Sequence, residues 1–313
     1  MNPTEIDINA AYRYLSLETI AFMIGIVFSY ASVVFLVIDK STYMYAFLVA
    51  KILLSLLADF ALIPNLGVDG IAISNMIANG VMGVLSIGLL IWIKQLRPGK
   101  FNKEDVPHLK DWGRIGLFAG GQQFLDNIIY ALMICRMVSA VSESGNYWVS
   151  NNFIWGWLLI PITCLVEIIR KDAGADGYKL KQINYYSITA VVIVIWSALI
   201  PTYQWFFGTV EGIENPGRIF EIVIKNLGFY VVYAFSQIPD AIFVGMGKTK
   251  YNAINSVLCN IVYYGVWFIF YKTGVVTMTM DMIIIMFGCG NVFHWIVSLV
   301  EEKVFLKKET IAL

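Results

Sequence analysis

The sequence predicts an all-α polytopic membrane protein, and three observations support this fold class. Hydrophobic residues make up 58% of the 313 residues and charged residues only 14%, whereas soluble domains average about 45–50% and about 25%. The apolar residues gather in nine runs long enough to cross a bilayer, which takes about 20 residues. Basic residues crowd into alternate connections between these runs. Because lipid offers no hydrogen-bond partners to an open sheet, each run is expected to be a helix.

The predicted spans follow one another along the whole chain. The fourth and seventh stand apart because each carries an acid deep in an apolar run. We place the nine spans at residues 15–38, 43–64, 70–93, 112–137, 147–169, 185–206, 224–244, 251–271 and 280–300.

The distribution of Lys and Arg predicts the orientation of the chain. Sixteen basic residues fall in the connections on one side and four on the other. Cytoplasmic connections carry the excess of Lys and Arg, so the richer side is expected to be cytoplasmic. This predicts a multi-pass protein of the cell (plasma) membrane with its C-terminus in the cytoplasm.

One long polar connection predicts the domain organisation. The stretch 94–114, KQLRPGKFNKEDVPHLKDWGR, divides three spans from six. We therefore expect a first domain at residues 1–93, a cytoplasmic linker at 94–111 and a second domain at 112–313.

The two parts also resemble each other in sequence. Residues 39–60 and 247–268 match at an offset of 208, and both enter a span from the same side. An offset that preserves orientation indicates a parallel repeat. If the repeated unit is the six spans after residue 112, the first copy has only its last three. The matching pairs are Lys40/Lys248, Ser41/Thr249, Tyr43/Tyr251 and Phe60/Phe268.

Several classes of function are disfavoured by composition. The formal net charge is zero, so no nucleic-acid partner is expected. The four cysteines lie far apart in apolar runs, which disfavours a disulfide framework or a metal site. The stretch GMGKTK, 245–250, lacks the glycine spacing and the preceding strand of a phosphate-binding loop. No clustered catalytic set is visible, so we expect neither an enzyme nor a cofactor.

Asp126 and Asp240 are the main candidate site residues. A charged side chain at a bilayer centre costs about 3 kcal/mol, and such residues mark ion pathways and proton relays. Each acid is therefore a candidate cation-coupling group that takes Na⁺ or H⁺, and a Na⁺ ion at Asp126 and Asp240 is the one metal we consider. The alternative is that each acid only forms hydrogen bonds to neighbouring helices.

Polar and helix-bending residues lie close to both acids in sequence. Their oxygens suit a hard cation, although hydrogen bonding between helices is an equal alternative. Pro239, next to Asp240, removes a backbone donor and is a candidate hinge. His294 has no visible partner, so a structural role is favoured over a proton relay. The candidate cavity residues are Gln122, Gln123, Asn127 and Gln237.

An ordered set of segments resembles the multidrug and toxic compound extrusion (MATE) family. Residues 8–15, INAAYRYL, resemble the entry to the family's fourth helix, and residues 58–79 resemble its fifth-to-sixth connection. Residues 114–126, RIGLFAGGQQFLD, resemble the start of the seventh helix. Residues 237–250, QIPDAIFVGMGKTK, resemble the tenth helix and its exit. No single motif is specific, but together they cover nearly the whole chain in order.

The resemblance implies a fold and an activity. It implies three helices of an N-lobe, a six-helix C-lobe, and an N-terminal truncation that omits the first three helices. A missing three-helix segment is then a further partner besides the lipid bilayer and small-molecule substrates. The implied function is ion-coupled multidrug efflux: Na⁺ or H⁺ antiport of organic cations or amphipathic compounds by alternating access.

Three alternatives remain open. A lipid-linked oligosaccharide flippase of the same superfamily is expected to line its cavity with several Arg and Lys to hold pyrophosphate. A membrane-embedded enzyme or assembly factor is expected to carry a catalytic cluster at one helix end. A truncated chain that is inactive alone is the third alternative.

Overall fold

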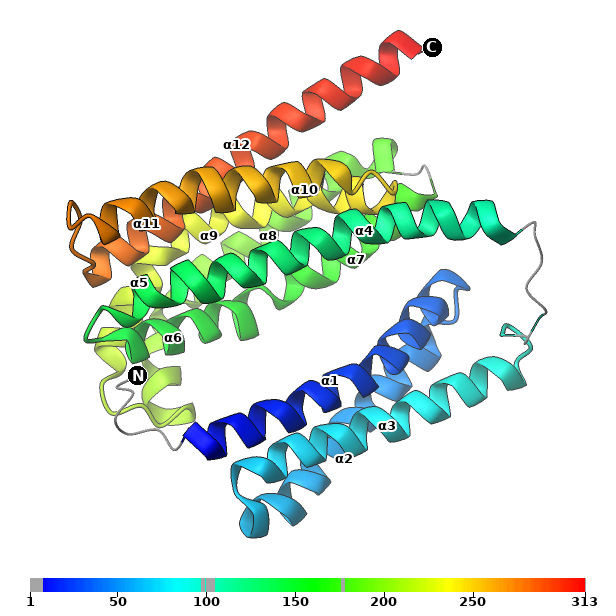
Figure 1. The fold of residues 1–313 in the computed structure, drawn as a ribbon, viewed down its shortest axis with the longest axis horizontal. Helices are drawn as coiled ribbons and strands as arrows, with labels where there is room; N and C mark the ends of the chain where they lie inside the picture. The colour runs from blue at the N-terminus through cyan, green and yellow to red at the C-terminus, as the bar shows by residue number, and fades with distance from the viewer. Residues whose placement is uncertain (1–7, 97–98, 100–104, 176–177, 313) are drawn as a thin grey trace. The chain divides into compact units, whose positions relative to one another are not determined.

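All regular secondary structure in the described part of the chain is helical (Figure 1). The computed structural model describes residues 8–96, 99, 105–175 and 178–312. By contacts the chain divides into two compact units, Asn2–Asn102 and Lys103–Leu313. The all-α prediction is therefore confirmed.

The smaller unit consists of three long helices. They are α1 (Ile8–Val37), α2 (Ser41–Leu66) and α3 (Val68–Trp92). Helix α3 packs against both others, and its contacts with α1 are the more extensive. The core at one end of this unit is formed by Ala31, Phe35 and Leu90, which are almost completely buried.

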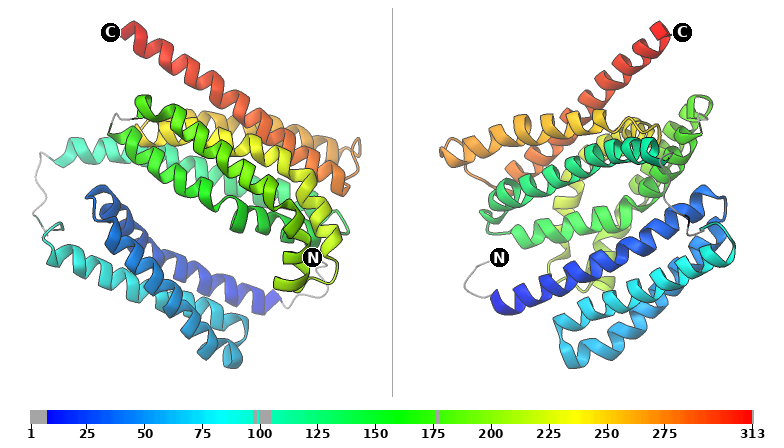
Figure 2. Two further views of the ribbon diagram at one scale, coloured as in Figure 1. Left: turned by 180° about the vertical axis from the view of Figure 1, so that it is seen from behind. Right: turned by 45° about the vertical axis from the view of Figure 1, so that its right-hand side comes forward.

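The larger unit carries the remaining helices of the described chain (Figures 1 and 2). Several of them contain a π-helical segment (η) that continues an α-helix. In chain order they are α4 (Asp105–Ile129), η1 (Tyr130–Ile134), α5 (Cys135–Ser139), α6 (Ser144–Phe153), η2 (Ile154–Leu158), α7 (Ile160–Gly174), α8 (Tyr178–Trp205), η3 (Phe206–Val210), α9 (Pro216–Gly245), α10 (Lys250–Val257), η4 (Leu258–Tyr264), α11 (Gly265–Lys272) and α12 (Met280–Ala312).

Helix α9 is the central element of the larger unit. It packs against α6, α7, α8, α10 and α12. Its start is well defined, because Pro216 occupies the first turn and the Asn215 side chain accepts a hydrogen bond from the backbone N–H of Arg218. A helix in contact with so many neighbours buries residues on most of its circumference, among them Asn226, Ala234 and Ile238. Polar groups on α9 are thus placed inside the bundle.

Among the described residues, seven helices are long and apolar enough to cross a membrane, and an eighth span is formed if the bent pair Ser144–Leu158 and Ile160–Gly174 counts as one. The bend is 51° and lies beside Pro161, whose ring cannot continue the hydrogen-bond ladder of the preceding turn. The chain is accordingly a multi-pass membrane protein.

The predicted span 112–137 differs from the others. It is helical throughout, in α4, η1 and α5, yet it does not meet the same requirement of length and apolarity. Its apolar residues are interrupted by glycines and by Gln122, Gln123, Asp126 and Asn127. The structure thus supports seven or eight of the nine predicted spans on apolar character, and the polar residues of this segment belong to the site described next.

Candidate functional site

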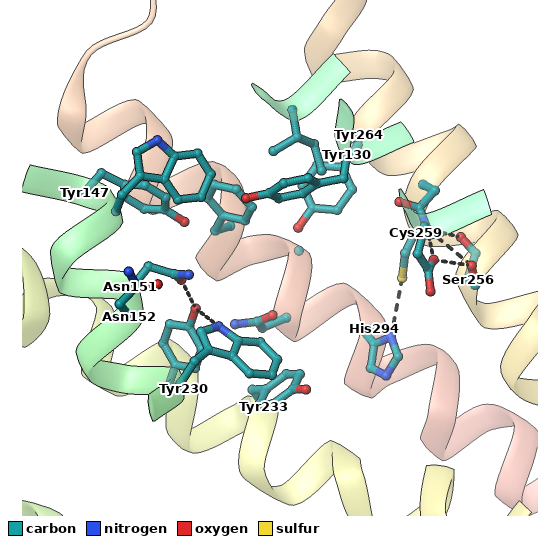
Figure 3. A pocket seen from close by; sticks show the side chains of 18 of the residues that line it. Tyr130, Tyr147, Asn151, Asn152, Tyr230, Tyr233, Ser256, Cys259, Tyr264 and His294 are labelled. Atoms are coloured by element: carbon teal, nitrogen blue, oxygen red, sulfur yellow. Dashed lines mark hydrogen bonds between the residues drawn. The ribbon is translucent and has the colours of Figure 1, made fainter. Parts of the chain in front are cut away.

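The larger unit contains a cavity of about 500 Å³ whose wall is built by α4–η1, α6–η2, α9, α10–η4 and α12 (Figure 3). Three of its five wall elements contain a π-helical segment, which is common at functional sites. Aromatic side chains form much of the wall: Tyr130, Tyr147, Trp148, Trp155, Tyr230, Tyr233, Tyr264 and Phe287. Amide side chains add hydrogen-bonding groups: Gln122, Asn151, Asn152, Asn260 and Asn291.

The wall carries little formal charge. Within the described residues, Asp126 is its one carboxylate and His294 its one imidazole, and neither Lys nor Arg lines it. An apolar and aromatic cavity with a few convergent polar groups is the usual form of a small-molecule site. This one favours cationic or neutral ligands over anions.

Asp126 faces this cavity from α4 and is held by donors from the neighbouring helix. Its Oδ1 atom accepts hydrogen bonds from Ser256 Oγ and from Asn260 Nδ2, both at 2.6 Å. Asn260 Nδ2 also donates to the backbone carbonyl of Ser256 at 3.0 Å, which fixes its rotamer. Asp126 is therefore bound to α10–η4 through one oxygen and also lines the cavity.

Asp240 lies on α9 and is bound by α12. His294 Nε2 lies 2.6 Å from Asp240 Oδ2, and Ser298 Oγ donates to Oδ1 at 2.8 Å. Asp240 does not line the cavity, whereas His294 does. The histidine thus connects the cavity to an acid behind its wall. The expectation of a histidine without a partner is corrected by this contact.

Helix α10–η4 joins the two acids into one network. Asn255 Nδ2 donates to Ser298 Oγ at 2.8 Å, and Cys259 Sγ donates to Asn255 Oδ1 at 3.2 Å. Cys259 Sγ also lies 3.8 Å from His294 Nδ1 (Figure 3). The residues that bind Asp126 and those that serve the Asp240 pair are therefore neighbours on one helix.

The sequence contained a signal for this network that was missed. Polar residues occur at 252, 255, 256, 259 and 260 of one span. The spacing of three and four places them on one side of a helix. Asn252 completes the set, because its Nδ2 donates to the backbone carbonyl of Asp240 at 3.1 Å.

The predicted cavity residues have different positions in the structure. Gln122 lines the cavity with Asp126. Gln123 and Asn127 do not line it; both are exposed, and Asn127 Nδ2 donates to the backbone carbonyl of Gln123 at 2.8 Å. Gln237 is half-buried on α9, outside the lining. Pro239 is buried within α9, which remains one continuous helix.

Aromatic groups of the wall are fixed by contacts of their own. Tyr230 donates its hydroxyl to Asn151 Oδ1 at 2.9 Å and accepts a hydrogen bond from Trp155 Nε1 at 3.1 Å. On the opposite side, a Cβ added to Gly290 would lie 2.5 Å from the Tyr264 hydroxyl. Glycine at 290 therefore allows this ring to approach α12. These contacts hold the Tyr230 and Tyr264 rings in defined positions at the cavity wall.

One further acid lies behind the wall. Glu301 is 9% exposed, and its Oε1 atom has no hydrogen-bond partner among the described residues. It follows His294 and Ser298 on α12 and interacts electrostatically with both Asp240 and His294. Burying a carboxyl oxygen without a hydrogen-bond partner costs free energy of folding. Glu301 is therefore a third ionisable residue beside Asp240 and His294.

No family model and no curated protein matches the sequence. Solved structures do match the fold. A structure described as MATE in the straight conformation has a TM-score of 0.68 at 17% identity, over 86% of this chain and 63% of the other. The outward-facing conformation of a multidrug resistance MATE family transporter of the MOP superfamily gives the same four values.

A MOP superfamily transporter from Pyrococcus furiosus has a TM-score of 0.66 at 18% identity, over 86% of this chain and 63% of the other. It is described by the reverse polarity of its binding pocket, which suggests a different function. The present chain thus spans less than two thirds of the length of these proteins. At this level of identity the likeness establishes the architecture, and the chain has the fold of MATE-type transporters.

Proposed function

We propose that the chain acts in secondary active multidrug efflux, by antiport of H⁺ or Na⁺ against organic cations or amphipathic compounds. The observation that carries this proposal is a single carboxylate, Asp126, in an aromatic and amide-lined cavity without a basic side chain among its described residues. Aromatic faces attract organic cations within about 6 Å of the ring, more strongly when both are desolvated. Asp126 supplies the countercharge.

The coupling step is assigned to Asp240 and His294. Both carboxylate oxygens of Asp240 are already engaged, Oδ2 by the imidazole and Oδ1 by Ser298. A Na⁺ ion would have to displace these groups, whereas a proton can be added to or removed from the pair in place. No group of three or more His, Cys, Asp or Glu within the described ranges is arranged to hold a metal ion. We therefore favour H⁺ at Asp240, and a Na⁺ ion would compete with substrate at Asp126 beside Gln122.

The network on α10–η4 gives these steps a physical connection. Cation binding at Asp126 weakens its hold on Ser256 and Asn260. Proton binding at Asp240 changes the hydrogen bonds that reach Asn255 on the same helix. Each ligand then favours one conformation over the other, as alternating access requires. The supply of energy is sufficient, since one charge moving down 100 mV releases about 2.3 kcal/mol.

Other elements of the proposal concern the whole transporter. We place it in the plasma membrane with the C-terminus in the cytoplasm, and assign Pro239 and Gln237 to bending of α9 next to Asp240. The matched structures are longer than this chain. A further three-helix segment is therefore a proposed partner, and a truncated chain that is inactive alone is the alternative to efflux by this chain.

A flippase for lipid-linked oligosaccharides is the second candidate. The described residues give the cavity no Arg or Lys that would hold a pyrophosphate. This observation favours efflux of cations. The Pyrococcus furiosus protein, described by a pocket of reverse polarity, illustrates that the charge of the cavity rather than the fold distinguishes functions within this architecture.

The decisive test is export of a fluorescent organic cation from cells that express the chain, with and without the genomic DNA upstream of Met1. Asp126→Asn and Asp240→Asn are each expected to reduce export to the level of empty cells. Asp281→Asn is the matched control. This acid lies in the first turn of α12, is 67% exposed and forms an ion pair with Lys225 of α9. If all forms reach the membrane and none of them exports the dye, the efflux proposal is wrong.

A further inference from the structure

A second pocket of the larger unit lies away from the cavity, between the start of α4 and the α9–α10 turn. Its volume is about 370 Å³. The turn is the GMGKTK stretch, in which Gly247 has φ +67°, a left-handed conformation that favours glycine. The main side chains around the pocket are Asp111, Arg114, Ile115, Phe118, Lys248 and Lys250.

The turn is fixed to α4, so the positions of its lysines are defined. The Thr249 hydroxyl donates to the backbone carbonyl of Ile115 at 3.2 Å, and Thr249 is only 2% exposed. The backbone N–H of Lys248 donates to the carbonyl of Phe243 at 2.7 Å. The first contact holds the lysine-bearing turn against α4, the helix that carries Arg114, and the second closes the turn onto the end of α9.

The pocket has an excess of positive charge. Arg114, Lys248 and Lys250 surround it, with Asp111 as the one acid among its described residues. None of the three basic groups has an ion-pair partner in the described part of the chain, although Lys250 Nζ lies 5.1 Å above the Tyr251 ring. Elsewhere in this unit, basic side chains such as Lys225 do form ion pairs. Three basic groups around one acid leave the pocket with a net positive charge, which attracts an anion.

The surroundings identify the class of anion. The planar guanidinium of Arg114 and the point charges of two lysines match a phosphate group. Ile115 and Phe118 add an apolar side to the same pocket. The turn joins the end of candidate span Pro216–Gly245 to the start of Lys250–Lys272, so the pocket is at membrane-boundary level. Basic pockets between spans at this level suit phospholipid headgroups.

We propose that this pocket binds a phosphate-bearing group, either the headgroup of an anionic phospholipid or free phosphate. The inference is independent of the proposed efflux function and uses none of the cavity residues. It also gives a role to the GMGKTK stretch, whose lysines contact the phosphate from a turn between two helices, in a geometry unrelated to a nucleotide-binding loop.

The test is native mass spectrometry of the purified, delipidated chain with phosphatidylglycerol, phosphatidylcholine or inorganic phosphate. Lys248→Gln/Lys250→Gln is expected to weaken phosphatidylglycerol binding about tenfold to thirtyfold, because each basic group near the surface adds about 1 kcal/mol. Lys248→Arg/Lys250→Arg keeps the charge and is expected to keep the binding, which separates loss of the site from misfolding.

The matched control is Lys40→Gln/Lys272→Gln, which removes the same charge. Lys40 holds the position equivalent to Lys248 in the smaller unit, and Lys272 lies over an aromatic ring as Lys250 does. If inorganic phosphate binds and phosphatidylglycerol does not, the ligand is free phosphate; if phosphatidylglycerol binds, it is the headgroup. Equal binding of phosphatidylcholine, equal loss in the control, or unchanged binding in the Gln variant would overturn the proposal.

Discussion

The turns α1–α2 and α9–α10 are built alike, although they lie 208 residues apart in the sequence. In the smaller unit the backbone N–H of Lys40 donates to the carbonyl of Phe35 at 2.9 Å. In the larger unit the N–H of Lys248 donates to the carbonyl of Phe243 at 2.7 Å. Both bonds span five residues and close a turn of the same form.

The aromatic packing beside these turns is also repeated. Tyr43 lies against Phe35 with ring centroids 6.0 Å apart, and Tyr251 lies against Phe243 at 4.8 Å. The sequence match at this offset therefore corresponds to a local structure in which a phenylalanine, a lysine and a tyrosine have the same roles in each unit.

The two units differ in the helix that begins after the turn. The polar side of α10–η4 has almost no counterpart on α2, where Lys51 is the one polar residue at the equivalent positions. At the same offset of 208 in the sequence, Asp240 and His294 fall on Ser32 and Ser86, and Glu301 falls on Ile93. The α2 residues at the five equivalent positions are Met44, Phe47, Leu48, Lys51 and Ile52. The same local turn thus precedes a helix with an ionisable network in one unit and a helix with a largely apolar surface in the other.

The smaller unit has a polar contact of its own in a different place. Asn75 Nδ2 donates to both carboxylate oxygens of Glu18, at 3.0 and 3.2 Å. The residues equivalent to these two in the larger unit are Asn226 and Ile283. Only the larger unit combines an acid, an imidazole and a shared helix of donors within the described residues. The difference indicates that the network, rather than the scaffold, carries the proposed coupling.

The largest effect is expected from separating Asp240 from His294. His294→Gln removes the imidazole and leaves a buried carboxylate partly unpaired, which typically costs about 3–5 kcal/mol. We expect a lower Tm and no pH-gradient-driven export. Asp240→Asn/His294→Gln should be less destabilised than the sum of the single variants, because the two residues interact directly. Thermal unfolding in detergent and dye export measure the two effects.

Ser32 and Ser86, which fall on Asp240 and His294 at the offset of 208, provide the control for these single and double variants. Ser32→Asn and Ser86→Ala alter the same positions of the smaller unit, where the described residues form no such ionisable pair. They should shift Tm by a few degrees at most and leave the pH dependence of export unchanged. Equal loss of export in both units would contradict the assignment of coupling to the larger unit.

An intermediate effect is expected at Gly290, whose equivalent in the smaller unit is Met82. In Gly290→Ala the new methyl group would lie 2.5 Å from the Tyr264 hydroxyl, so the ring must move. Overpacking of this kind costs about 1–3 kcal/mol, and we expect weaker binding of a fluorescent organic cation to the purified chain. Gly228→Ala on α9 is the control, since its Cβ would meet no described atom within 4 Å. Unchanged binding in Gly290→Ala would exclude this cavity as the ligand site.

The smallest effect is expected at the loop before α6. Hydrogen bonds from Arg218 and Asn146 lower the pKa of Glu143. A carboxyl group with a lowered pKa in the folded state adds stability that is present above its ordinary pKa and is lost as the pH falls through its folded pKa. Because the side chain is 40% exposed, the contribution is less than about 1 kcal/mol.

Glu143→Gln should therefore lower Tm slightly at neutral pH and remove part of the decrease in Tm between neutral and acidic pH. Differential scanning calorimetry of the wild-type chain and the variant between neutral and acidic pH measures this change in Tm. The ion pair of Arg13 with Asp69 in the smaller unit is untouched by this change and provides the comparison. A larger decrease on acidification in the variant would contradict the prediction.

The sequence predicted the helices well because a segment that crosses a bilayer needs about 20 consecutive apolar residues, and such runs are visible in the sequence itself. It also singled out Asp126 and Asp240, since an acid in such a run is conspicuous. It could not predict their partners. His294 is 54 residues from Asp240 and Asn260 is 134 from Asp126, so the contacts depend on which helices become neighbours.

The sequence also could not predict which of the amide side chains near Asp126 would line the cavity. Gln122 and Gln123 are adjacent, and only the first lines the cavity, because successive residues of a helix point in different directions. The bend beside Pro161 was partly foreseeable from the proline, whereas the π-helical segments have no comparable marker. Polar spacing along a span was the one available signal for the network.

The η4 segment allows helix α10–η4 to alter its contacts without breaking. One residue corresponds to about 100° of rotation in an α-helix. Asn255 precedes η4 and Asn260 lies within it. If the π turn moved along the span past Asn260, Asn260 would rotate relative to Asn255 by about that angle. Asp126 would lose the Asn260 donor, whereas Asn255, which precedes η4, would keep its contact with Ser298. A twist of the helix about its own axis could therefore loosen its hold on one acid while it still contacts the partner of the other.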